Sequence, residues 1–123
     1  MVAQTPIQKL YSNSRTFLQD VLGVCERVFQ ESGFDPALFS ITSIEGLVER
    51  YERSLRFHRR AKILTGPFTI HVENVDRNQF YRVHLEVPGC VLQGTTVFDE
   101  LERLRDKAYR EFEIQGIPYS RFE

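Results

Sequence analysis

The feature that most constrains how this chain folds is the dipeptide Pro88-Gly89, which stands between an alternating strand pattern and the start of a helix. Pro88 fixes its own φ and donates no backbone hydrogen bond, and Gly89 tolerates a positive φ, so the chain is expected to reverse there. Residues 90–93 leave room for one short strand. Thr96 then has the spacing of a helix cap, because Asp99 follows it by three positions as in a capping box.

Two longer strands and a closing helix are predicted around this turn. Apolar and polar residues alternate in 68–73 and again in 81–87, which is the period of a strand with one buried and one solvated face. The polar residues 74–79 between them indicate a hairpin loop. Apolar residues at helical spacing predict a helix over about 97–114, which would cover the apolar face of the sheet. The tail, residues 117–123, is expected to add an edge strand or to lie along the surface.

The front of the chain is predicted to be helical. Apolar residues recur at three- and four-residue spacing over about 6–32 and again over about 43–60. A Gly-Pro pair at 66–67 marks a boundary between a helical region, 1–66, and a sheet-helix domain, 67–123. The predicted fold class is α+β, with an N-terminal helical region followed by a β-β-β-α(-β) unit. In that unit, one helix covers an antiparallel sheet.

The composition is typical of a folded, water-exposed protein. Hydrophobic residues make up 41% of the 123 and charged residues 27%, and the formal net charge of -1 argues against nucleic-acid binding through the surface as a whole. The two cysteines, Cys25 and Cys90, form no metal-binding motif, and Cys25 lies on an apolar stripe. No targeting segment and no apolar run of membrane-spanning length is evident. A reduced cytoplasmic protein without a membrane segment is expected.

The order of residues around the turn resembles that of a known family. The strand pair is followed by Pro88-Gly89-Cys90, then by Gln93-Gly94 and Thr96, and the last helix is followed by Gly116-Ile117-Pro118. This pattern, within residues 67–123, is similar to the sheet domain of HicB-type antitoxins (the HicB-like family). The resemblance implies a cytoplasmic protein that binds a small ribonuclease toxin and blocks it. We therefore expect a non-enzymatic protein-binding module that binds and neutralises a small protein partner.

By this resemblance, the partner would contact the polar sheet face, the last helix and the tail. The expected contact residues are His71, Arg82 and His84 on the strands, and Asp99, Glu100, Glu102 and Asp106 on the helix. The acids of the helix would complement a basic partner. Residues 67–123 carry ten acids and seven Lys or Arg, an excess that permits a cationic partner.

A basic run in the second predicted helix supports an alternative function. Its residues are Arg50, Arg53, Arg56, Phe57, Arg59, Arg60 and Lys62. Glu49 and Glu52 precede Arg53 and Arg56 by four positions, so ion pairs on a solvated helix explain part of the pattern. However, no acid occurs from Arg56 to Lys62, and Phe57 points among the arginines. Such a surface suits nucleic acid, with its phosphate backbone and unstacked bases, or an acidic protein.

The remaining alternative is a structural role, in which the two apolar N-terminal helices form a homo-oligomer such as a homodimer, or a docking surface in a larger assembly. Catalysis has weaker support. His71 and His84 share the polar sheet face with carboxylates but match no metal motif, and Cys90 has no evident base beside it. Phosphate-loop, dinucleotide and hydrolase motifs are absent from the sequence. We therefore assign no catalytic residue, no metal and no cofactor.

Overall fold

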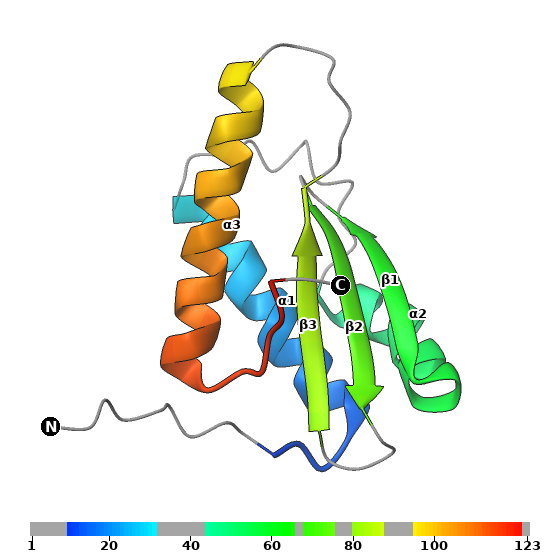
Figure 1. Cartoon of the computed structure of the whole chain (residues 1–123). Helices are drawn as coiled ribbons and strands as arrows, with labels where there is room; N and C mark the ends of the chain where they lie inside the picture. The colour runs from blue at the N-terminus through cyan, green and yellow to red at the C-terminus, as the bar shows by residue number, and fades with distance from the viewer. Residues whose placement is uncertain (1–9, 32–43, 66–67, 76–79, 88–94, 122–123) are drawn as a thin grey trace, which may run out of the picture.

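In the computed structural model, which describes residues 10–31, 44–65, 68–75, 80–87 and 95–121, the chain forms three α-helices and three β-strands (Figure 1). In chain order these are α1 (Ser14–Glu31), α2 (Ile44–His58), β1 (Arg60–Thr65), β2 (Phe68–Val75), β3 (Phe80–Glu86) and α3 (Thr95–Gln115). Helices precede the strands and a helix follows them, so the predicted α+β class is confirmed. None of the described helices has the length and apolar content that a membrane crossing requires.

The strands form one sheet in the order β1-β2-β3, and each neighbouring pair is antiparallel. Successive side chains of a strand point to opposite faces of the sheet. The apolar side chains gather on one face, where the buried residues are Ala61, Ile63, Phe68, Ile70, Val72, Tyr81, Val83 and Leu85. The alternation predicted for β2 and β3 is therefore confirmed, and the other face is polar.

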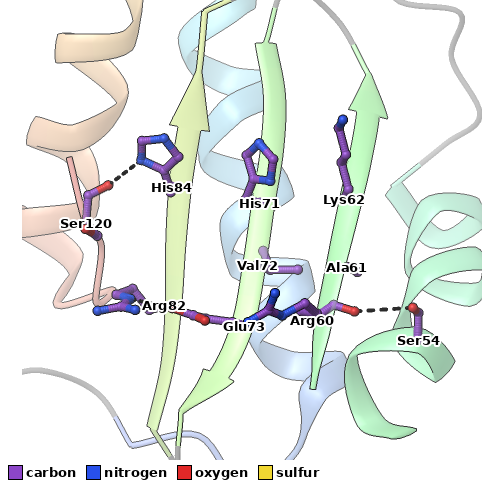
Figure 2. A pocket seen from close by; sticks show the side chains of 10 residues that line it. All are labelled: Ser54, Arg60, Ala61, Lys62, His71, Val72, Glu73, Arg82, His84 and Ser120. Carbon is purple, nitrogen blue, oxygen red and sulfur yellow. Dashed lines mark hydrogen bonds and ion pairs between the residues drawn. The ribbon is translucent and has the colours of Figure 1, made fainter. Parts of the chain in front are cut away.

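The helices gather behind the apolar face. Helix α1 lies behind the sheet, with α3 beside it toward β3 and α2 beside it toward β1 (Figure 1). Phe17 of α1 stacks on Tyr81 of β3 with ring centroids 4.9 Å apart, and Phe29 lies 5.2 Å from Phe68 of β2. The prediction of a single covering helix must therefore be extended, because α1 also covers the sheet. No helix of the described residues lies over the polar face (Figures 1 and 2).

Helix α1 begins at Ser14, later than the sequence pattern predicts. The predicted start near residue 6 lies outside the described residues, but 10–13 are not helical, so the helix predicted over about 6–32 is too long. Asn13 caps the helix: its Oδ1 accepts hydrogen bonds from the backbone N–H of Thr16 at 2.8 Å and from the Thr16 hydroxyl at 3.1 Å. Tyr11 is buried in the core instead of continuing the helical stripe.

The junction between α2 and β1 also differs from the prediction. The helix ends at His58, and Arg59 has a φ of 62°, a left-handed conformation that terminates the helix and redirects the chain. Arg60 is already in β1. The carbonyl of Arg59 accepts a hydrogen bond from the backbone N–H of Asn74 at 2.8 Å, which anchors the junction to β2. The prediction of helix to residue 60 is therefore wrong at its end.

Strand β1 is the element that the sequence pattern did not predict. Ala61 and Ile63 are buried while Lys62 and Leu64 are exposed, which is the alternation of a strand, but it extends over few residues and follows directly on a helix. The third strand predicted at 90–93 lies outside the described residues. Because β1 belongs to the region 1–66 and pairs with β2, the two predicted regions share one sheet and one core.

Helix α3 starts and ends close to its predicted bounds. It ends at Gln115, and the next residue, Gly116, has a φ of 76°, the left-handed conformation that glycine adopts without strain. The backbone N–H of Ile117 donates to the carbonyl of Phe112 at 2.8 Å, and that of Gly116 donates to Glu113 at 3.2 Å, which together form a Schellman motif. The chain is thereby turned back toward the sheet.

The C-terminal tail, here residues 117–121, closes the outer edge of β3. The backbone N–H of Val83 donates to the carbonyl of Pro118 at 3.1 Å, and the carbonyl of Val83 accepts from the N–H of Ser120 at 2.8 Å. Val83 and Tyr119 form a parallel bridge. The expectation that the tail adds to the sheet edge is confirmed for this short stretch, and it covers backbone groups that an open edge would expose.

Candidate binding site on the polar face of the sheet

The polar face of the sheet carries two rows of facing side chains. The strand register aligns Arg60 with Glu73 and Arg82 in one row, and Lys62 with His71 and His84 in the next. These six residues line a depression of about 670 Å³, with Ser54 of α2 at one side and Ser120 of the tail at the other (Figure 2). We call this depression the sheet-face site. Three residues predicted from the strand alternation, His71, Arg82 and His84, meet in it.

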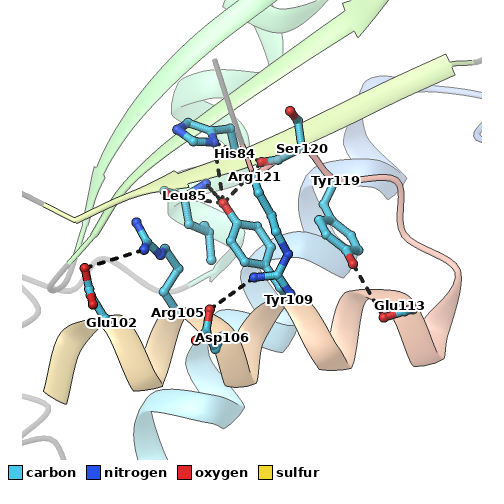
Figure 3. A network of polar contacts seen from close by, with 10 residues as sticks. All are labelled: His84, Leu85, Glu102, Arg105, Asp106, Tyr109, Glu113, Tyr119, Ser120 and Arg121. Carbon is cyan, nitrogen blue, oxygen red and sulfur yellow. Dashed lines mark hydrogen bonds and ion pairs between the residues drawn. The ribbon is translucent and has the colours of Figure 1, made fainter. Parts of the chain in front are cut away.

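His84 is held by the C-terminal tail. Its Nδ1 lies 2.9 Å from the carbonyl oxygen of Ser120, which can only accept, so Nδ1 carries the proton and Nε2 is left as an acceptor in the neutral ring. The hydroxyl of Tyr109 lies 3.2 Å from the same oxygen and accepts a 2.9 Å hydrogen bond from the N–H of Leu85 (Figure 3). Burial raises the pKa of Tyr109, so this hydroxyl stays protonated at neutral pH.

His71 is held by a carboxylate on the neighbouring strand. Its Nε2 lies 2.8 Å from Glu86 Oε1, and this hydrogen bond is the main reason why the pKa of Glu86 is lowered. The rings of His71 and His84 are 5.7 Å apart between centroids and tilted by 37°. Among the described residues, no group of three or more His, Cys, Asp or Glu is arranged to hold a metal ion.

Arg60 and Lys62 give the sheet-face site its positive charge. Arg82 is paired with Glu73: its Nε donates to Oε1 at 2.7 Å and its Nη2 contacts the same oxygen. Within the described part of the chain, neither Arg60 nor Lys62 forms an ion pair with a carboxylate. The site therefore attracts anionic groups such as carboxylates and phosphates.

The four acidic residues predicted to bind a partner lie elsewhere, on α3. None of them is among the residues that line the sheet-face site. Asp99 and Glu100 are exposed, Glu102 lies 4.0 Å from Arg105, and Asp106 forms a 3.1 Å ion pair with Arg121 (Figure 3). The predicted contact residues thus fall on two surfaces, one basic on the sheet and one acidic on α3.

A second depression lies on α2. It has a volume of about 510 Å³ and is lined by Arg50, Arg53, Ser54, Phe57 and His58. We call it the α2 groove. The side chain of Phe57 is 63% exposed, and the guanidinium carbons of Arg53 and Arg56 lie 5.9 and 4.8 Å from its ring centroid. The predicted position of Phe57 among the arginines is therefore confirmed.

The ion pairs predicted along α2 form only in part. Glu52 pairs with Arg56 at 3.6 Å, as predicted. Glu49 does not pair with Arg53, because it bonds Arg15 of α1 at 3.0 Å instead. Ion pairing with an acid four residues earlier therefore explains the position of Arg56 but does not explain that of Arg53.

Sequence reasoning missed Ser54, the side chain that joins these two depressions. Ser54 lines both of them, and its hydroxyl donates to the carbonyl of Arg60 at 3.3 Å. Arg60 and Lys62 were predicted on or just after a helix and lie on a strand facing His71 and Glu73. The short alternation in β1 is the signal that could have placed Arg60 and Lys62 on a strand.

The apolar stripe of α1, which was the basis of the dimer hypothesis, is buried within the chain itself. Phe17, Leu18 and Val21 are fully buried in the core that α1 shares with the sheet. Cys25 lies in the same stripe, and burial raises the pKa of its thiol to about 12, which fits the predicted packing role and keeps it unreactive. Cys90 lies outside the described residues.

Comparisons of the chain with protein-family models, curated proteins and solved structures found no match. The functional argument therefore depends on the geometry and charge of the surfaces described above.

Proposed function

We propose that this protein is a non-enzymatic protein-binding module that holds a small protein partner against the polar face of its sheet. The observation that carries the proposal is that the described helices gather on one face of the sheet and that none of them lies over the other, where polar side chains are held in fixed positions. His71 is oriented by Glu86 and His84 by the tail. Oriented side chains reduce the entropy lost on binding, so this face is prepared for a partner.

The charges indicate the chemistry of the partner's contact surface. Arg60 and Lys62 form no ion pair with a carboxylate in the described residues, although the charge of Lys62 helps to lower the pKa of Glu86, whereas Arg82 is already paired with Glu73. Asp or Glu side chains of a partner would form ion pairs with Arg60 and Lys62, and main-chain carbonyl groups of the partner would accept hydrogen bonds from the same two side chains. A partner that is basic elsewhere would meet the exposed acids Asp99 and Glu100 on α3.

The resemblance to HicB-type antitoxins suggests which class of protein the partner belongs to. On that basis the bound protein is a small ribonuclease toxin, and complex formation in the cytoplasm neutralises it. The resemblance covers residues 67–123 and thus includes β2, β3, α3 and the tail. Strand β1 and the α2 groove lie outside it and would distinguish this chain from the family pattern.

The test is to co-express the chain with the product of the adjacent reading frame, purify the complex and measure its affinity by calorimetry. Lys62→Glu and His84→Ala are expected to weaken binding by about tenfold or more, because each removes a side chain that lines the site. Arg110→Glu, at an exposed position of α3, makes the same charge change as a control. RNA cleavage by the partner should stop when the wild-type chain is added. A complex that tolerates both sheet variants would contradict the proposal.

A further inference from the structure

The surface of α2 carries positive charge that the described residues do not neutralise by ion pairs. Three acids near the α2 groove have partners of their own, since Glu49 bonds Arg15, Glu52 bonds Arg56 and Glu73 bonds Arg82; Glu45, in the first turn of α2, forms no ion pair within the described residues. The remaining cations, Arg50, Arg53 and Arg59, form no ion pair within the described residues. Pairing of these acids elsewhere leaves the groove with an uncompensated positive potential.

An exposed aromatic ring lies in the middle of this charge. Phe57 is 63% exposed, while Val48 and Leu55, the apolar residues of α2 that face inward, are completely buried. The ring therefore serves no packing role in the core. If a ligand covered this ring and excluded water from it, the complex would gain the free energy of burying apolar surface. Folding of the chain does not gain this free energy, because the ring stays exposed.

We propose that the α2 groove binds single-stranded nucleic acid, which goes beyond the protein recognition proposed above. Phosphates would contact the guanidinium groups of Arg50 and Arg53, and one unpaired base would stack on the ring of Phe57. Arg56, whose guanidinium carbon is 4.8 Å from the ring centroid, adds a cation next to the stacked base. The nucleic-acid chain would continue from the α2 groove past Ser54, which lines both depressions, toward Arg60 and Lys62.

The exposed ring distinguishes this ligand from other polyanions. The bases of a duplex are stacked on each other, so a duplex offers phosphates to the arginines and nothing to Phe57. A membrane surface would need a broad apolar face, and the other apolar side chains of α2 turn toward the core. An unpaired strand is the ligand that uses both the charges and the ring.

The first experiment measures fluorescence anisotropy of a labelled 15-nucleotide uridine oligomer with the full chain. Phe57→Ala is expected to weaken binding about tenfold, which is the usual loss for one stacked base. Ile114→Ala truncates another exposed apolar residue, on α3, and should leave the affinity unchanged. Circular dichroism checks that both variants fold.

A second pair of variants tests the charges. Arg53→Glu should weaken binding at least tenfold and should reduce the steepness with which affinity falls between 50 and 200 mM salt. Arg110→Glu makes the same change of net charge on α3 and should alter neither. Equal losses in these two variants would mean non-specific attraction and would overturn the proposal.

Other results would overturn the proposal as well. They are the absence of binding at 50 mM salt, binding that survives Phe57→Ala, and equally tight binding of a duplex of the same length. Preference for vesicles of anionic lipid over the oligomer would count against it in the same way. Failure here leaves the sheet-face site untouched, because His84→Ala changes a residue outside the α2 groove and outside the path proposed for the nucleic acid, and so tests that site separately.

Discussion

The flank of the molecule built from α3 and the C-terminal tail pairs some of its charges and leaves both acids and bases among the rest, whereas the charges left without an ion pair on α2 and β1 are mostly cations within the described residues. On the first flank Arg121 bonds Asp106 and Arg105 approaches Glu102. On the second, Arg50, Arg53, Arg59, Arg60 and Lys62 form no ion pair within the described residues. Charges that satisfy each other help to close a fold, and charges without partners attract a ligand.

The aromatic residues of the two flanks show the same contrast. An arginine lies over a ring on each side: Arg121 is 4.9 Å from the centroid of Tyr109, and Arg56 is 4.8 Å from that of Phe57. Tyr109 is 1% exposed and bonds the edge of β3, but Phe57 is 63% exposed. Similar pairs of side chains thus close the sheet on one flank and face solvent on the other.

The largest effect is expected from truncating one phenylalanine on each flank. Phe112 of α3 is fully buried, so Phe112→Ala should lower the free energy of unfolding by about 3–5 kcal/mol. Phe57→Ala should change it by less than about 0.5 kcal/mol, because the ring is exposed. Urea denaturation measures both. A similar loss for the two variants would show that Phe57 is a structural residue and would remove the contrast between the flanks.

A smaller loss is expected when the hydroxyl that closes the β3 edge is removed. Tyr109→Phe leaves the N–H of Leu85 without its 2.9 Å acceptor in a buried site. We expect a loss of about 1–3 kcal/mol in the free energy of unfolding, and faster hydrogen exchange at the Leu85 amide. The matched change Tyr51→Phe on α2, where the hydroxyl has no hydrogen bond within the described residues, should cost less than about 0.5 kcal/mol. Unchanged exchange at Leu85 in Tyr109→Phe would contradict this assignment.

The ion pair between Asp106 and Arg121 is expected to contribute still less. Its side chains are 53% and 47% exposed, so Asp106→Asn should cost about 0–1 kcal/mol and the cost should vanish in 1 M salt. Arg53→Gln on the other flank should cost nothing, because it breaks no pair and removes repulsion. Thermal unfolding at low and high salt compares the two. A larger cost for Arg53→Gln than for Asp106→Asn would reverse the comparison.

The smallest expected effect is a pH dependence on the polar face between the flanks. The hydrogen bond from His71 lowers the pKa of Glu86 in the folded state, so its stabilisation is present above the ordinary glutamate pKa. It is lost as the pH falls through the folded value. In an NMR titration, His71→Ala should raise the Glu86 pKa toward the ordinary value, and His84→Ala should shift it less. No shift in His71→Ala would show that another group perturbs Glu86.

Local patterns predicted the elements whose faces alternate cleanly. The alternation of β2 and β3 identified both the buried and the polar residues of the sheet, and with them His71, Arg82 and His84. The position of Phe57 among arginines also followed from helical periodicity. These predictions succeeded because each depends only on residues that are close together in the sequence, within one or two turns of a helix or a few residues of a strand.

The errors occurred where a local pattern continued past a change of conformation. Apolar residues at helical spacing extend before Ser14, but Tyr11 joins the ring cluster of the core and Asn13 caps the helix. The basic run extends past His58, but the positive φ of Arg59 ends the helix there. In both cases a contact with another part of the chain helps to set the end of the helix, as between Tyr11 and Tyr81 or between Arg59 and Asn74. The spacing of apolar residues within the helix carries no information on such a contact.

The sequence by itself determined which side of each strand is wet and which residue types gather near α2, because these follow from spacing along one segment. Only the tertiary structure decided that Lys62 lies opposite His71 and His84, that α1 covers the sheet, and that residues 117–121 close β3. These arrangements depend on register and on contacts such as that between Ser14 and Tyr81, 67 residues apart. Their energies depend on the whole core closing at once, so no single segment encodes them.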